Sequence, residues 1–465
     1  MARRSQRHPA RRRGRSAADR GRRGWTGHGS LVLAARWRCA PPVRCLQPDP
    51  MAVRPGRIPS SHHLRRAARL CERGASLVEL MVAMTIGLIV ALIVVATVTG
   101  VGSNLRNVGA NAAAQVSTQV GLGLIDEAGR SAGAGLYSNG SLICPTINAW
   151  FSGATRLNGA TLMPARITDG GADTASDVLV FTGSTAAGPL SNMPVIVNMA
   201  SAADTITVND SGLIGANDVA LIGAPGQNVP CTLFQVTAAP VVIAACAGNA
   251  TSCKQLPRGT DPNLGYNPPD LAVAFATPQR YGFTNGGGVA GPASVSRLGA
   301  GFRQTAFRIE CQALVTFNAF TGVPGPCTSN PLSFAAGVDA LASDIVLMHA
   351  QYGISATGAS DVVTGWVGAN APPWNNPGPA DVERIKAIRV VLVSRSKEAA
   401  STEVTAATCT NAAGVVNTGP CSFQDAAAPV IDLSATPVAG SLTWRNYRYR
   451  VHRAVIPLRN VLWSN

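Results

Sequence analysis

A single carboxylate stands just before a long uncharged run near the start of this chain. Glu79 is followed by 26 residues, Leu80 to Leu105, that carry no charged side chain. As a helix this run would be about 39 Å long, enough to cross a hydrocarbon core of about 30 Å. A carboxylate at the edge of a bilayer is costly and is normally retained for a partner. We therefore expect a membrane-spanning helix whose Glu79 pairs with a positive group; the alternative is a carboxylate that reaches the lipid headgroups.

Cysteine is the next residue type that could do chemistry. Three of the eleven cysteines precede the uncharged run, and the remaining eight are an even number that suits disulfides in an oxidising compartment. No CxxC motif occurs, and only two histidines follow the run, so we expect no metal site. Proximity along the chain favours three disulfides and leaves a fourth by elimination: Cys311–Cys327, Cys409–Cys421 and Cys246–Cys253, then Cys144–Cys231.

Sequence motifs of enzymes are missing. We find no GxSxG, HExxH or GxxxxGK[ST] motif, and no GxGxxG after a strand. His349 lies in the apolar run IVLMHAQY, which is typical of a buried or hydrogen-bonded histidine. Asp381 and Glu383 lie just before an apolar strand pattern, where a solvated pair is more common than a catalytic one. We expect no enzymatic activity and no cofactor.

Basic and apolar residues alternate close to the end of the chain. In Tyr447–His452, sequence YRYRVH, a strand would place Arg448, Arg450 and His452 on one face. Such a strip could bind DNA or an acidic partner next to its tyrosines. The alternative, which we favour, is the charged outer face of an edge strand that discourages aggregation.

The net charge of +15 over 465 residues comes from the N-terminal region. Residues 1–73 contain 19 arginines and three acidic residues, and the rest of the chain is nearly neutral. Residues 1–50 have no apolar periodicity, so they are either a basic arm or upstream sequence ahead of a start at Met51, and we favour the second. The basic residues before the uncharged run predict that its N-terminal side is cytoplasmic.

One long helix must carry the uncharged run. No proline occurs between Ala75 and Pro145, and glycines follow at Gly133 and Gly135, so we expect a helix over residues 75–131. Its first half would lie in a membrane or filament core, and its second half would pack on a globular head through an apolar stripe. The stripe consists of Leu105, Val108, Ala112, Val116, Val120, Leu124 and Ala128.

Residues 132–465 have the pattern of a β-rich head. Short apolar runs alternate with Gly, Asn, Pro and Asp turns. A Gly-rich segment at 282–301 is either an internal domain boundary or a surface loop. The clearest strand patterns are DVLVFTG (177–183), PVIVNMA (194–200), DTITVND (204–210), DVALIGAPG (218–226), CTLFQVTAAP (231–240) and IKAIRVVLVSR (385–395).

The junction before the uncharged run resembles the class III signal of type IV prepilins and type II secretion pseudopilins. The matching residues are Gly74-Ala75-Ser76-Leu77-Val78-Glu79-Leu80-Met81-Val82-Ala83, with Ala75 where that family usually has Phe. The resemblance implies that residues 1–74 are a leader cleaved after Gly74 by a prepilin peptidase, which then methylates Ala75. It also implies that Glu79 meets the new amino terminus of a neighbouring subunit.

Further stretches are similar to minor pilins of the PilW type. They are LIDEAGRSAGAGLY (124–137), NDVALIGAPGQNVPCTLFQVT (217–237), VDALASDIVLMHAQYGIS (338–355) and NYRYRVHRAVIPLRNVL (446–462). The resemblance implies a type IV pilin-like α+β fold, in which a long N-terminal hydrophobic helix packs on a β-rich, disulfide-bonded head.

The same resemblance implies a function in assembly. Such a protein would be anchored in the bacterial inner membrane by a single span, with its N-terminus cytoplasmic and its head periplasmic, and would later enter the pilus. It would co-nucleate type IV pili at or near the tip. Its partners would be the prepilin peptidase, other minor pilins, the major pilin and, as a further candidate, a tip adhesin. Two alternatives remain, a J-type pseudopilin of type II secretion and a tip adhesin or DNA-binding module, although we favour protein partners over nucleic acid.

Overall fold

The computed structural model describes residues 76–138, 141–185, 192–209, 213–243, 252–259, 265–438 and 440–462, without the side chains of 99–114 and Ser138. The structure divides into two units after Leu80. The expected leader (1–74) and its cleavage site at Gly74 and Ala75 lie outside the described residues, as does Cys246.

A single helix, α1, runs from Leu77 to Ser131. It contains no proline, and the backbone N–H of Leu80 donates to the carbonyl of Ser76 at its start (3.1 Å). Gly133 and Gly135 follow the helix with φ of +81° and +78°, a conformation that glycine adopts without steric cost. These two glycines end the helix and turn the chain into the head.

Three sheets make up most of the head. The six-stranded sheet is antiparallel except where β10 pairs with β3. Its order is β4 (Ala154–Thr161), β3 (Thr146–Phe151), β10 (Pro230–Gln235), β9 (Val219–Gly223), β15 (Ser294–Gly299) and β7 (Asn192–Pro194). The five-stranded sheet has the order β20 (Asp339–Ser343), β17 (Ala313–Asn318), β16 (Phe302–Glu310), β6 (Val178–Ser184) and β5 (Ala165–Thr168). The four-stranded sheet has the order β22 (Val363–Val367), β21 (Ile345–Ser355), β23 (Ile385–Arg395) and β26 (Tyr449–Pro457).

Smaller elements connect and cover these sheets. A three-stranded sheet has the order β11 (Val241–Ile243), β12 (Cys253–Leu256) and β8 (Ile206–Val208). The two-stranded pairs are β1 (Tyr137–Ser138) with β2 (Ser141–Leu142), β13 (Arg280–Tyr281) with β14 (Val289–Ala290), β18 (Thr328–Ser329) with β19 (Leu332–Ser333), and β24 (Cys409–Thr410) with β25 (Val416–Asn417). The short helical segments are α2 (Leu271–Ala274), α3 (Pro379–Val382), the 3-10 turn η1 (Trp444–Asn446) and α4 (Arg459–Leu462).

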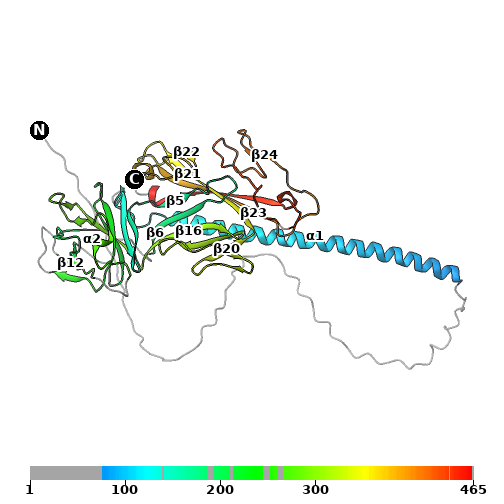
Figure 1. The fold of residues 1–465 in the computed structure, drawn as a ribbon, viewed down its shortest axis with the longest axis horizontal. Helices are drawn as coiled ribbons and strands as arrows, with labels where there is room; N and C mark the ends of the chain where they lie inside the picture. The colour runs from blue at the N-terminus through cyan, green and yellow to red at the C-terminus, as the bar shows by residue number, and fades with distance from the viewer. Residues whose placement is uncertain are drawn as a thin grey trace, which may run out of the picture. The chain divides into compact units, whose positions relative to one another are not determined.

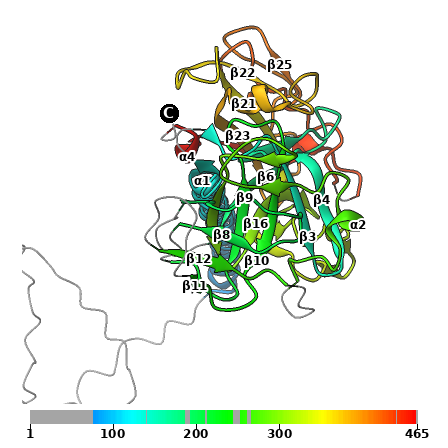
Figure 2. The same cartoon turned by 90° about the vertical axis from the view of Figure 1, so that its left-hand side faces the viewer.

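The C-terminal half of α1 lies against the five- and four-stranded sheets, near β6, β16 and β20 (Figure 1). Figure 2 shows α1 nearly end-on with α4 and β23 beside it. Ile125 of α1 is fully buried in the main core together with Phe181 of β6, Leu314 of β17 and Ile456 of β26. The head thus encloses one side of the helix with side chains from both sheets.

The predicted apolar stripe of α1 is only partly correct. Ala128 packs against the main core as expected, whereas three other members of the stripe do not. The side chains of Leu105, Val108 and Ala112 lie outside the described residues. Val116, Val120 and Leu124 are exposed by 61, 54 and 38 % respectively. The face that packs on the head instead includes Ile125, and two glycines let the strands approach the helix closely. The stripe contains no glycine because it consists of apolar side chains, yet the closest contacts of the helix with the sheets are at Gly121 and Gly129.

Four of the six predicted strand patterns contain a regular strand at the predicted place: β6, β9, β10 and β23. DTITVND contains only the short β8, and PVIVNMA is mostly irregular, with Val195 forming one isolated bridge to Val208. The Gly-rich segment 282–301 contains β14 and also β15, which lies inside the six-stranded sheet. The structure agrees with the expected class of an apolar helix and a β-rich, disulfide-bonded head.

Candidate functional site

Glu79 lies in the first turn of α1, where it is exposed. The backbone N–H groups of a helix's first turn lack partners within the helix, and this end of the dipole favours a negative charge. The carboxylate is therefore compatible with the helix itself. It is also free to meet a positive group on another molecule.

The side chains of the apolar part of α1 next to Glu79 are not buried by the residues that the structure describes. Residues Leu77–Val98 form a 22-residue segment long and apolar enough to cross a membrane, and all of its side chains are exposed. Its two threonines, Thr85 and Thr97, donate their hydroxyls to carbonyls three or four residues earlier at 2.9 Å. Such internal bonds allow a hydroxyl to lie in an apolar medium. The length, hydropathy and exposure of this segment fit a helix that lies in a bilayer or among other protein subunits.

The contact between α1 and the head is unusually close at two glycines. A Cβ atom at Gly121 would lie 2.7 Å from Cδ2 of Leu314, and one at Gly129 would lie 2.5 Å from Cγ2 of Ile456. At the end of the helix, the amide of Asn460 donates to the carbonyls of Ser131 (3.2 Å) and Ala132 (3.0 Å). Residues from the end of the chain therefore fix the C-terminal end of α1.

Three disulfides link the cysteine pairs that sequence proximity and elimination favoured. They are Cys144–Cys231, Cys311–Cys327 and Cys409–Cys421, with sequence separations of 87, 16 and 12 residues. Cys253 is also disulfide-bonded, and its expected partner Cys246 lies outside the described residues. The first bond joins the start of the head to β10, whereas the other two close local loops.

Strand β23 holds three buried cations that the sequence analysis did not single out. The most elaborate site surrounds Arg389, which is 3 % exposed and donates to both carboxylate oxygens of Asp425 (2.7 and 3.0 Å). Arg389 also donates to Gln351, and it stacks on the rings of Trp366 and Phe423 at 4.8 and 4.5 Å. This bonding lowers the pKa of Asp425. The site holds the long connection between β23 and β26 against the four-stranded sheet.

The other two buried cations of β23 also hold loops against the sheet, by donating hydrogen bonds to loop carbonyls. Lys386 donates to the carbonyl of Gly358 at 2.8 Å. Arg395 donates to the carbonyl of Pro437 at 2.6 Å and stacks on the ring of Tyr447 at 4.4 Å. Buried charges are tolerated only when paired or hydrogen-bonded. All three cations thus have structural partners.

His349 is buried and hydrogen-bonded, as its apolar surroundings predicted. Its Nδ1 lies 3.5 Å from Oδ2 of Asp177, and its Nε2 lies 3.1 Å from the carbonyl of Asp173. Burial acts to lower the pKa of His349, but the hydrogen bond and charge of Asp177 outweigh it, so the pKa is raised. Asp177 also accepts the backbone N–H of Ala350 (2.8 Å). The pair holds the 169–177 loop against β21.

The acidic residues before β23 form a surface contact. Asp381 lies 3.7 Å from Arg384, and Glu383 is exposed. Within the described ranges there is also no group of three or more His, Cys, Asp or Glu side chains that could hold a metal ion.

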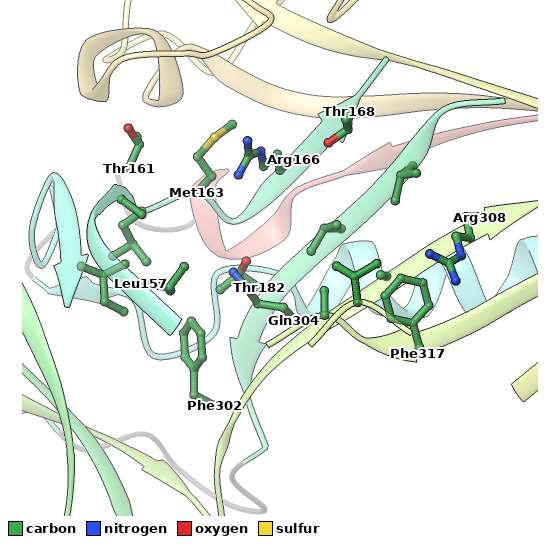
Figure 3. Close-up of a pocket in the computed structure, with 18 residues that line it drawn as sticks. Leu157, Thr161, Met163, Arg166, Thr168, Thr182, Phe302, Gln304, Arg308 and Phe317 are labelled. Carbon is green, nitrogen blue, oxygen red and sulfur yellow. The ribbon is translucent and has the colours of Figure 1, made fainter. Parts of the chain in front are cut away.

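An apolar groove of about 350 Å³ lies over the outer face of the five-stranded sheet (Figure 3). Its floor is formed by β6 and β16, and Figure 3 shows Leu157 and Phe302 toward one end and Phe317 and Arg308 toward the other. The residues that line it include Arg166 and Arg308 but no acidic side chain. The guanidinium of Arg308 is already engaged by Glu310 and by the ring of Phe317 at 4.5 Å. The groove has the apolar character of a binding site but few free polar groups to orient a ligand.

The basic strip near the end of the chain lies on an edge strand. Arg448 immediately precedes β26, and Arg450 and His452 share one face of it, opposite Ser394 and Leu392 of β23. His452 Nε2 lies 3.3 Å from the hydroxyl of Ser394. Burial and the charge of Arg450 lower the pKa of His452. The strip is therefore a real feature of the folded head.

Sequence reasoning missed the Arg389 site, the glycine contacts and the groove. For Arg389 a signal was present, because IKAIRVVLVSR places three cations in an otherwise apolar strand. Cations in such a strand must be paired or lie at its surface. Their partners are distant in sequence and could not be identified.

Two family models match the chain. The prokaryotic N-terminal methylation motif matches residues 69–95, which include Glu79 and the start of α1. This match defines the class of protein: the chain has a prepilin-type N-terminus, and the apolar helix that follows fits membrane anchoring. Type IV pilus-assembly protein W matches residues 332–460, which include the whole four-stranded sheet. The two matches confirm the resemblance to PilW-type type IV pilus proteins with a class III signal. No curated protein and no solved structure matches.

Proposed function

We propose that this protein is a minor pilin that helps to initiate and assemble type IV pili. In this proposal it co-nucleates the filament with other minor pilins and stays at or near the tip, where its large head is accommodated more easily than in the shaft. The observation that carries the proposal is the combination of a prepilin-type N-terminus, a fully exposed apolar segment and the match of residues 332–460 of the head to type IV pilus-assembly protein W. A pilus is a helical stack joined by non-closing contacts, which requires surfaces that the single chain leaves uncovered.

Glu79 is the proposed assembly residue. Cleavage after Gly74 would create an amino group at Ala75, and the exposed Glu79 of one subunit would accept that amine from its neighbour. The pairing would neutralise two charges in an apolar filament core and set the axial register. The exposure of Glu79 in the first helical turn supports this role.

The proposed location follows from the same features. The chain would be held in the inner membrane by one span, with its N-terminus cytoplasmic and its head periplasmic, until the pilus extracts it. Its partners would be the prepilin peptidase, other minor pilins, the major pilin and a tip adhesin. We propose a structural role without catalysis, since His349 and the buried cations are engaged in holding loops.

The match to type IV pilus-assembly protein W favours a pilus over type II secretion. Deleting the gene tests this choice: the strain should lose most of its surface pili, and type II secretion should be unchanged. Normal piliation would refute the proposal, and loss of secretion with normal piliation would favour the J-type pseudopilin.

Processing is tested with the full chain in the same strain. Protein purified from membranes should begin at N-methylated Ala75, and Gly74→Ala should remain uncleaved in the inner membrane. A mature N-terminus beyond Val101 would mean ordinary secretion and would refute the pilin assignment.

A further inference from the structure

Among the strands that the structure describes, β26 is paired on one side only, because β23 is its single neighbour in the four-stranded sheet. The register between β23 and β26 shows which backbone N–H and C=O groups of β26 point away from β23. Arg395 donates its backbone N–H to the carbonyl of Asp344, on the β21 side, so the next residue, Ser394, faces β26. Ser394 is opposite Arg450, and at the far end Leu458 donates to the carbonyl of Lys386 (3.0 Å). Even-numbered residues of β26 therefore face β23.

The odd-numbered residues of β26 point their backbone groups outward. They are Tyr449, Val451, Arg453 and Val455, and no described residue forms a backbone hydrogen bond with them. The side chain of Val455 is 55 % exposed, so this end of the edge is accessible. A row of open N–H and C=O groups is a template for one more strand.

The last part of the chain, which contains β26, is rich in basic residues. From Leu433 to Asn465 the chain has five arginines, one histidine and no acidic residue. Arg445 pairs with Glu403 at 2.5 Å, and Arg453 donates to the carbonyls of Ser422 and Cys421. The exposed side chains of Arg448 and Arg450 have no hydrogen-bond or ion-pair partner among the described residues.

We propose that the open edge of β26 binds an acidic, extended segment of another pilus subunit, which adds to the sheet as a fifth strand. The partner's backbone would pair with the outward groups of β26, and its carboxylates would meet Arg448 and Arg450. The identity of the partner as a pilus subunit rests on the proposed function. A strand fits better than DNA, because open peptide groups pair with peptide groups, and two free arginines provide few phosphate contacts.

The first experiment uses the full chain in pili-forming cells, with the photoreactive residue p-benzoylphenylalanine at position 455. It should crosslink to one pilus subunit, at a peptide that contains Asp or Glu. The matched control places the same residue at Val362, which is 68 % exposed and precedes β22 at the opposite edge of the sheet. The control should not capture that peptide.

Charge reversal then tests the recognition. Arg448→Glu together with Arg450→Glu should lower the crosslink at least about tenfold, since like charges oppose each other across the interface. Reversing the partner's acids to Lys should restore it. Both arginines are exposed, so the variant should fold, which unchanged disulfide-dependent mobility on a non-reducing gel would verify.

A backbone test is independent of charge. Val455→Pro removes one outward N–H but no hydrogen bond to β23, whereas Val455→Thr changes only the side chain. Proline should reduce co-purification of the crosslinked subunit, and threonine should not.

The proposal is overturned by an absent crosslink, by a captured peptide without acids or from a protein outside the pilus, or by a crosslink that charge reversal leaves unchanged. DNA binding by the wild type that is lost in the double variant would assign the strip to nucleic acid instead. Piliation of the deletion strain distinguishes failure of this proposal from failure of the proposed function. Normal piliation refutes the minor-pilin role. A crosslink that charge reversal leaves unchanged refutes only the binding of an acidic strand at the edge of β26.

Discussion

The contact between α1 and the head can be tested at one atom. In Gly129→Ala the new methyl group would lie 2.5 Å from Cγ2 of Ile456 and 3.2 Å from the ring of Phe181. Both neighbours are buried, so neither can move away freely. Overpacking of this kind costs about 1–3 kcal/mol, and the higher helix propensity of alanine offsets about 1 kcal/mol of that cost. We expect Gly129→Ala to lower the free energy of unfolding by up to about 2 kcal/mol.

A matched control lies earlier on the same helix, at Gly123. Gly123 is exposed, and a Cβ atom there would meet nothing within 4 Å. Gly123→Ala should therefore raise the free energy of unfolding by up to about 1 kcal/mol. The difference between the two variants isolates the close contact, because both share the propensity gain.

Urea titration of the full-length protein in detergent, followed by tryptophan fluorescence, measures both variants. The cost of Gly129→Ala should shrink in an Ile456→Ala background, because that change removes the clashing methyl group. If Gly129→Ala is as stable as Gly123→Ala, or if its cost is unchanged in the Ile456→Ala background, the inferred close packing of helix and sheet is wrong.

Three further outcomes are expected. Glu79→Ala should be cleaved and inserted normally but be scarce in sheared pili, and Glu79→Gln should show a milder defect; normal amounts of the Ala variant would support the headgroup alternative. Replacing Cys409 and Cys421 by serine should lower the free energy of unfolding by about 3 kcal/mol in the same urea titration, and no change would contradict a stabilising disulfide. Arg389 lowers the pKa of Asp425 below its ordinary value of 3.8. The stabilisation of the fold by the Arg389–Asp425 pair is therefore present above pH 3.8 and is lost as the pH falls below that value and the carboxylate takes up a proton. Asp425→Asn should therefore make stability less dependent on pH below about 4, and an unchanged pH profile would contradict the linkage.

Features that depend on neighbouring residues were predictable from the sequence. The uncharged run after Glu79 has one physical solution, an apolar helix, and the glycines at 133 and 135 mark its end. Cys409 and Cys421 are close enough in sequence that their pairing needed no knowledge of the fold. Strand β23 was predicted to the residue because its apolar run is long and its boundaries are charged.

Features that depend on distant residues were not predictable. Arg389 is satisfied by Gln351 and Asp425, which lie 38 and 36 residues away. Nothing in the residue pattern indicates which acid reaches the buried guanidinium, because the connecting loops have no regular pattern. The open edge of β26 has the same origin, since the strand's position at the side of the sheet is set by topology and not by its own residues.

The error in the helix face follows from a conflict between two uses of one helix. Hydrophobicity selected Val116, Val120 and Leu124, which the head leaves exposed, whereas packing selected Gly121, Ile125 and Gly129. A helix that served only its own head would bury its largest apolar residues first. Here Val116, Val120 and Leu124 remain available to other molecules, and the head packs on Ile125 and on the two glycines. That division suits a subunit whose helix must satisfy both its own head and an assembly around it.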